Sequence, residues 1–113
     1  MSKILYTKTH GWVLPSGNKA KIGISDYAQK ELGDLVFVEL PSIGKKVEIG
    51  EEVCSVESVK AVSSVYSPVS GVVVAVNTEL ESAPEKINQT PLDAWIAEIE
   101  FDKIEDGLTE EDI

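Results

Sequence analysis

Histidine and cysteine are nearly absent from this chain of 113 residues, which has one of each. The single cysteine, Cys54, excludes an internal disulfide, and its valine-rich surroundings are typical of a small buried hydrophobe. The single histidine, His10, and this one cysteine provide too few of the usual ligands for a metal site. A catalytic triad is not indicated, because no nucleophile motif accompanies His10. We expect His10 to be a structural strand residue, with a place in the lining of a cleft as the alternative.

Long apolar runs are also missing, since no stretch approaches the ~20 residues that a membrane-spanning helix needs. The N-terminal residues form neither a secretory nor an arginine-rich transit segment, which predicts a cytoplasmic protein. Basic side chains number 10 against 20 acidic ones, so the formal net charge is -10. Such a charge argues against partners such as nucleic acid or anionic membranes. It favours a soluble, acidic protein, which we expect to be a monomer.

Alternating and valine-rich segments are abundant and indicate a mostly β protein. Residues 11–14 and 20–24 predict a hairpin around a turn signal at 15–18, and a second turn signal lies at 67–71. The apolar run 35–40 predicts a strand that is covered on both faces. Further strands are expected at 47–49, 52–56, 72–76 and 95–101, with Trp12 and Trp95 as core aromatics. This pattern favours an antiparallel sandwich or flattened barrel.

Helix signals are few and short. Ser25 as N-cap and Gly33 as the closing glycine predict a helix over 26–32. Ser82 and Glu85 have capping-box spacing, with Pro84 in the first turn, which predicts a second helix. We expect one domain over 1–113, with a core at about 6–101 and an acidic C-terminal tail at 102–113. In that tail, Thr109 and Asp112 have the spacing to cap one last turn, with fraying as the alternative.

Lys60 is the residue that most suggests a function. It lies between two valine-rich runs, so we expect it at the tip of a hairpin, where a modifying enzyme can reach its primary amine. Its neighbours Val59, Ala61 and Val62 are apolar, whereas an ordinary solvent turn carries Gly, Asn or Asp. Glu57 adds an anionic group that an enzyme can recognise. From these residues alone, a modified lysine and a solubilising turn lysine remain alternatives.

Three separated motifs resemble the glycine cleavage system H-protein family. They comprise the lipoylation segment 57–61 with its continuation 65–71, the segment 22–29 continuing through 32–34 to 36–41, and the N-terminal strand 6–13. The motifs occur in family order and cover about residues 6 to 101, nearly the whole chain. The resemblance implies a lipoyl-domain-like barrel-sandwich hybrid, and a lipoyl-carrier protein rather than an enzyme.

The resemblance also implies the cofactor and the partners. Lipoate would be attached covalently to Lys60 by a lipoate ligase or lipoyl transferase, and Glu57 and Gly71 match positions associated with recognition by these enzymes. A pyridoxal-phosphate (PLP) glycine decarboxylase would load the arm with the aminomethyl group of glycine. A tetrahydrofolate-dependent aminomethyltransferase would take the one-carbon unit, and dihydrolipoamide dehydrogenase would reoxidise the dithiol.

Two positions depart from the family pattern. Family members commonly have acids where this chain has Gly11 and Ser64, and those acids are associated with holding the cationic aminomethyl adduct in a cleft. Without them, charge-assisted hydrogen bonds to an ammonium are lost. Thr9, Ser64 or a backbone carbonyl would be weaker substitutes, and His10 is a further cleft candidate. The departures keep two alternatives open: a divergent lipoyl carrier outside glycine cleavage (a lipoate donor or a carrier in sulfur metabolism), and an unmodified β interaction module.

Overall fold

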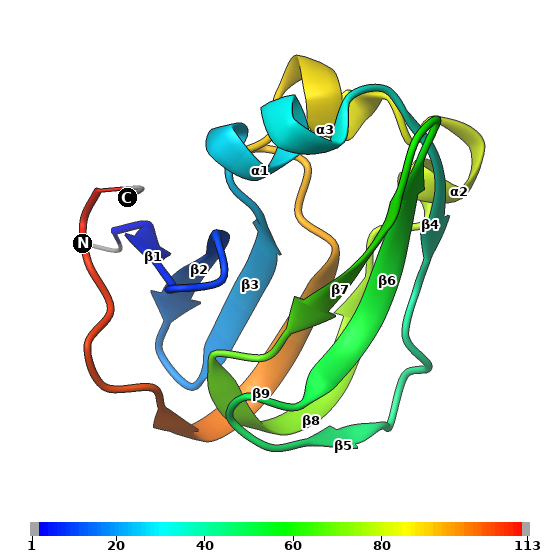
Figure 1. Ribbon diagram of the computed structural model, residues 1–113. Helices are drawn as coiled ribbons and strands as arrows, with labels where there is room; N and C mark the ends of the chain where they lie inside the picture. The colour runs from blue at the N-terminus through cyan, green and yellow to red at the C-terminus, as the bar shows by residue number, and fades with distance from the viewer. Residues whose placement is uncertain (1–2, 112–113) are drawn as a thin grey trace.

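The computed structural model describes residues 3–111, which form two antiparallel sheets around one hydrophobic core (Figure 1). The six-stranded sheet has the order β1-β2-β3-β9-β8-β5, and the three-stranded sheet has the order β4-β6-β7. The strands are β1 (Leu5–Tyr6), β2 (Gly11–Ser16), β3 (Lys19–Ile24), β4 (Leu35–Glu39), β5 (Lys46–Val47), β6 (Glu52–Ser58), β7 (Val62–Tyr66), β8 (Val69–Val76) and β9 (Ala97–Ile104). The predicted mostly β, sandwich-like class is confirmed, and within the described residues the sheets do not close into a barrel.

The predicted N-terminal hairpin is confirmed as the pair β2–β3, although its turn is shorter than expected. Both Pro15 and Ser16 belong to β2, and Pro15 lies opposite Ala20, so the turn itself contains Gly17 and Asn18. Proline is tolerated at this position because β1 pairs with β2 only as far as Val13. The hairpin therefore has a tight two-residue connection.

The first predicted helix is confirmed as α1 (Asp26–Leu32). The Ser25 side chain accepts the backbone N–H of Ala28 at 3.1 Å, which satisfies one of the free amides of the first turn. At the other end Gly33 has a φ of 81°, and its N–H donates to the carbonyl of Gln29. Local capping residues thus define both ends of this helix.

The predicted capping box at Ser82 is wrong. Ser82 is the last residue of α2 (Glu79–Ser82), and its hydroxyl donates to the carbonyl of Glu79 at 3.3 Å. The next helix, α3 (Lys86–Gln89), has Glu85 at its N-cap without a side-chain capping bond. Backbone turns rather than side-chain caps build these two short helices. In the part of the chain that the structure describes, no helix is long and apolar enough to cross a bilayer.

The expectation that strand 35–40 is covered on both faces is also wrong. Leu35 and Val38 are buried, but Val36 and Phe37 are 51% and 52% exposed. A register shift between Leu35 and Phe37, where β4 pairs with β6, places these two neighbours toward solvent. One face of the three-stranded sheet is therefore open to solvent and carries apolar side chains.

The turn signal at 67–71 is confirmed only in its first two residues, because β8 begins at Val69. The Ser67 hydroxyl donates to the carbonyl of Val69 at 2.6 Å and accepts the Val69 N–H at 3.2 Å, which closes the turn.

The acidic segment expected as a tail starts inside the sheet, since β9 continues to Ile104. Beyond β9, Thr109 pairs with Tyr6, with N–O distances of 2.7 and 3.1 Å between the two backbones. This pairing brings the end of the described chain beside β1 (Figure 1). Asp112, expected to cap a last turn with Thr109, lies outside the described residues.

The two tryptophans differ in burial. Trp12 is 2% exposed, and its indole N–H donates to the carbonyl of Pro91 at 3.0 Å, as expected of a core aromatic. Trp95 is half-buried, and the Lys21 ammonium lies 5.1 Å from its ring centroid. Only Trp12 is fully part of the interior.

Cys54 is buried as predicted, at 4% exposure, and burial raises the pKa of its thiol from 9.0 to about 12. Because the thiolate is the nucleophile, we expect no iodoacetamide adduct on the folded protein at pH 8 and one adduct after denaturation, measured by intact mass. The unfolded thiol ionises first as pH rises, so this group's contribution to stability declines above pH 9 and is lost by about pH 12. Rapid labelling of the folded protein would contradict the burial of Cys54.

Candidate functional site

Lys60 lies in the short turn that joins β6 to β7. The last pair between the two strands is Glu57 with Val62, which leaves Lys60 near the tip of the hairpin. Its side chain is exposed, and so are Val59 and Val62, at 68% and 67%. Across residues 3–111 no ion pair involves the Lys60 ammonium. The predicted placement of Lys60 is therefore confirmed, and Figure 1 shows the hairpin rising from the body of the sandwich toward the end that carries the helices.

Ser58 holds the turn in shape. It is 5% exposed, and its hydroxyl accepts the backbone N–H groups of Lys60 and Ala61 at 3.2 and 3.0 Å. The same hydroxyl donates to the carbonyl of Ala61 at 3.2 Å, next to the backbone bond from the Ser58 N–H to that carbonyl at 2.8 Å. The Ser58 side chain thus provides hydrogen bonds for the backbone N–H and C=O groups of a tip whose neighbouring side chains are apolar.

The tip rests on the segment that follows α1. The Val59 N–H donates to the carbonyl of Asp34 at 3.0 Å, and a Cβ placed on Gly33 would lie 3.8 Å from Cε of Lys60. Asn88 on α3 fixes this segment, because its side chain donates to the Gly33 carbonyl and accepts the N–H of Leu35, both at 2.9 Å. The aliphatic part of the Lys60 side chain therefore passes close to Gly33, whose backbone Asn88 holds in place, and the lysine itself is exposed to solvent.

Glu57 lies beside the tip on the open face of the three-stranded sheet. Its neighbours across the strands are Phe37 on β4 and Val62 on β7, and all three are exposed. This face therefore presents to solvent one negative charge, that of Glu57, flanked by the apolar side chains of Phe37 and Val62. The geometry suits the recognition role predicted for Glu57, which stays a prediction.

Ser64 lies further along β7, on the same face as Val62 and Tyr66, because alternate residues of a strand share a face. Its hydroxyl donates to a carboxylate oxygen of Glu52 at 2.8 Å. An acid is therefore present beside Ser64 after all, supplied by the neighbouring strand β6.

A pocket of about 200 Å³ lies beyond the end of β7, and we call it the Glu105 pocket. Its lining residues are Thr7, Thr9, Gly50, Tyr66, Ser67 and Glu105. Thr9 is thus brought next to Tyr66, which shares a face of β7 with Ser64. The Thr7 hydroxyl shapes this side of the pocket by accepting the N–H groups of Thr9 and Gly11 at 3.2 and 3.0 Å.

His10 does not occupy a strand, so that expectation is wrong. Its φ of 63° is the left-handed conformation, and β2 begins only at Gly11. The imidazole packs against Tyr27 with the two rings tilted by 39° and their centroids 4.4 Å apart, and His10 is not among the residues that line the Glu105 pocket. The contact joins the β1–β2 turn to α1.

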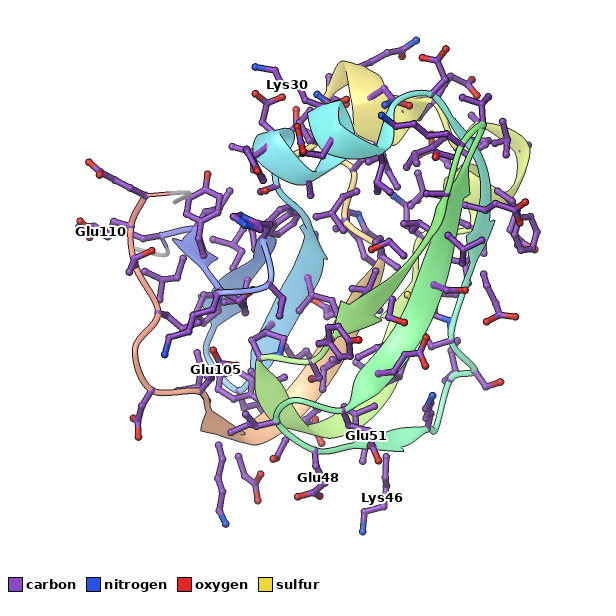
Figure 2. All side chains as sticks on the ribbon, in the orientation of Figure 1. Lys30, Lys46, Glu48, Glu51, Glu105 and Glu110 are labelled. Carbon is purple, nitrogen blue, oxygen red and sulfur yellow. The ribbon has the colours of Figure 1, made fainter. Side chains whose placement is uncertain are left out.

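Gly71 lies on β8 in the other sheet, apart from this group. A Cβ at Gly71 would lie 2.0 Å from the backbone oxygen of Glu100 on β9, so only glycine fits. It lines a different pocket of about 400 Å³ together with Lys46 and Glu48 of the β5 region, which Figure 2 labels at the bottom of the view. Close strand packing therefore explains the glycine, and its recognition role stays a prediction.

Several residues of the site have weak signals or none in the sequence. Ser58 has a detectable signal, because serine before a short turn commonly binds nearby amides. Asn88, Glu52 and Glu105 have none, since each acts on a segment that only the tertiary structure brings close.

Comparisons with known proteins agree with one another. The family model described as "Glycine cleavage H-protein" matches residues 4–111. A probable glycine cleavage system H protein of Pyrococcus furiosus is 58% identical over 109 residues, which cover 95% of this chain and 81% of that protein. A glycine cleavage system H protein of Rubrobacter xylanophilus is 49% identical over 110 residues, which cover 96% of this chain and 87% of that protein. A crystal structure of a glycine cleavage system H protein from Mycobacterium marinum superposes with a TM-score of 0.88 at 34% identity, covering 95% of this chain and 89% of that one. The chain therefore belongs to the glycine cleavage H-protein family and is one of its lipoyl carriers.

Proposed function

We propose that Lys60 is the residue that carries lipoate, in amide linkage, and that the loaded arm moves the aminomethyl group of glycine between enzymes. The observation that carries this proposal is an exposed amine without an ion-pair partner among residues 3–111, on a tip that Ser58 and Asn88 hold in place. A modifying enzyme meets a defined backbone instead of a mobile loop, which lowers the entropy lost on binding.

The chemistry of attachment fits this residue. The neutral ε-amine attacks an activated lipoyl carboxyl group, an amide bond forms, the activating group leaves and the amine proton goes to solvent. The product is uncharged, so the arm can lie against apolar side chains such as Val62 at less cost than the ammonium. When bound, lipoate supplies a reducible disulfide for group transfer.

Catalysis would reside in the partner enzymes and not in this chain. A glycine decarboxylase would load the arm, an aminomethyltransferase would unload it, and dihydrolipoamide dehydrogenase would reoxidise it. The open face around Glu57 and Lys60 supports this proposal, since separate enzymes need access to the same tip.

Intact mass measures the attachment directly. After expression with a lipoate ligase and lipoate, we expect one added lipoyl group on the unchanged protein and none on Lys60→Ala. Lys30→Ala is the matched control, because Lys30 is also an exposed lysine, and it should keep the modification. Unchanged mass in the unmutated protein would contradict the carrier function and favour an unmodified β interaction module.

Labelled glycine tests the pathway. We expect the lipoylated protein, mixed with glycine decarboxylase, to acquire label on the arm at a rate comparable to a standard H protein. If label transfers only to the standard protein, the chain serves a lipoyl pathway outside glycine cleavage.

A further inference from the structure

The segment beside Lys60 comes from outside the hairpin. Residues 33–35 lead from the end of α1 into β4, and we call them the shelf; Figure 1 shows the β6–β7 tip reaching this part of the chain. The Val59 N–H donates to the carbonyl of Asp34 at 3.0 Å, so the residue before Lys60 is bonded to the middle of the shelf. A Cβ built on Gly33 would lie 3.8 Å from Cε of Lys60. The lysine Nζ is therefore one bond beyond an atom that lies close to the shelf.

One side chain fixes the backbone on both sides of Asp34. Asn88 donates to the carbonyl of Gly33 and accepts the N–H of Leu35, both at 2.9 Å. It also donates to the side-chain oxygen of Gln29 on α1 at 2.9 Å, so both donors and the acceptor of the Asn88 amide are engaged. Since the Asp34 carbonyl itself accepts the Val59 N–H, the position of Asp34 relative to the tip is defined.

The Asp34 residue is exposed on this fixed backbone. Among residues 3–111 its carboxylate forms no ion pair and no side-chain hydrogen bond. A carboxylate that is held in place loses little conformational freedom when it pairs with a cation of another protein. Asp34 is thus an available acceptor for a charge-assisted hydrogen bond, next to the lysine that a modifying enzyme has to reach.

We propose that Asp34 is a specificity-determining residue for the lipoylation of Lys60, and that Asn88 is the residue that positions it. The inference rests on the proposed function. An enzyme that reaches Nζ covers the shelf, because the lysine side chain passes close to it. A Lys or Arg side chain of that enzyme then pairs with the Asp34 carboxylate. The enzyme would thus recognise two segments that are distant in sequence, the hairpin and the shelf.

Steady-state lipoylation tests the role of Asp34. The full-length protein is titrated against a purified lipoate ligase with lipoate and ATP, and the rate of mass gain gives KM and kcat. We expect Asp34→Asn to raise KM about fivefold or more and to change kcat by less than about twofold, because the ion pair forms when the two proteins bind. Asp34→Glu keeps the charge and should recover most of the loss. Glu39→Gln is the matched control, since Glu39 is an exposed acid at the other end of β4, and it should leave KM unchanged.

Ionic strength provides a second measurement of the same contact. Salt screens exposed charges, so raising its concentration should raise KM of the unchanged protein. We expect a smaller rise for Asp34→Asn, because one of the charges that salt would screen has been removed.

A double-mutant cycle tests the positioning role of Asn88. Asn88→Ala removes no charge, yet we expect KM to rise by a similar factor, because the shelf loses its two hydrogen bonds to this side chain. In the double variant with Asp34→Asn the two effects should not multiply, since both act through one carboxylate. Amide NMR gives the folded fraction of each variant, and KM is calculated for the folded protein. Gln89→Ala, at the exposed neighbouring position on α3, is the control.

Equal KM values for Asp34→Asn and Glu39→Gln would overturn the assignment of Asp34, and effects that multiply in the double variant would overturn the role of Asn88. Either result leaves the lipoylation of Lys60 standing. If the unchanged protein gains no lipoyl group at all, the proposed function fails and this inference fails with it, and intact mass alone reveals that outcome.

Discussion

Substitution of Gly71 with alanine is expected to destabilise the protein by about 3 kcal/mol or more, and to prevent folding in the least favourable case. An added Cβ would lie 2.0 Å from the Glu100 oxygen and 2.8 Å from both the Glu100 carbon and the Phe101 Cα. All three atoms are backbone, so no side-chain rotation relieves the overlap. Strands β8 and β9 must separate, which breaks hydrogen bonds between two neighbouring strands of the six-stranded sheet.

Denaturant unfolding monitored by tryptophan fluorescence measures this effect. Gly17→Ala is the control, because a Cβ there meets no atom within 4 Å and only the backbone conformation at φ 63° is strained, at a cost of about 1 kcal/mol. If both variants unfold at the same denaturant concentration, the close approach of the two strands is not as described.

Substitution of Ser58 with alanine should lower stability by about 1–2 kcal/mol and slow lipoylation of Lys60 by about fivefold or more. The turn loses the acceptor for two backbone N–H groups and the donor to the Ala61 carbonyl. The amine remains present, but the tip no longer holds one shape, so the modifying enzyme must order it on binding.

A time course of lipoylation, followed by intact mass, separates rate from extent. We expect Ser58→Ala to reach the same final mass as the unchanged protein, but later. Ser63→Ala is the matched control, since Ser63 lies in the same hairpin and its hydroxyl makes only a long 3.5 Å contact to the Ser64 carbonyl. Equal rates for Ser58→Ala and Ser63→Ala would show that turn geometry does not matter to the enzyme.

Local signals predicted much of the fold. Ser25 and Gly33 mark the ends of α1 because capping depends on residues within one turn of the helix end. The hairpin β2–β3 follows from alternation between apolar and polar residues around turn residues, and the tip at Lys60 follows from its position between two valine-rich runs. In each case the determining contacts lie within a few positions of sequence.

The expectations that proved wrong concern features that depend on contacts between residues distant in sequence, or on how the whole chain is placed. Whether Val36 and Phe37 face solvent depends on a register shift against β6, which an apolar run does not reveal. Ser82 has the spacing of a cap, yet the chain places it at the end of α2. His10 was expected in a strand because residues 6–13 resemble the family's N-terminal strand, but residues 7–10 connect β1 to β2 and His10 has a φ of 63° there.

The site was predictable only in part, for the same reason. The sequence pointed to Lys60, Glu57 and Thr9 through the lysine's surroundings and the family resemblance. Glu105 lies 39 residues beyond Tyr66 in the chain, and the pocket that joins them exists only once β9 has crossed the sandwich. No local pattern could bring Glu105 and Tyr66 into one pocket.

The pairing of Tyr6 with Thr109 has a practical consequence for anyone who labels or immobilises this protein. Both ends of the described chain lie together at the side of the sandwich away from the β6–β7 tip (Figure 1). An affinity handle, a dye or a surface linker attached at either end therefore leaves Lys60 unobstructed. A short peptide connecting the two ends would also permit new termini to be opened elsewhere, for example at Gly17 and Asn18.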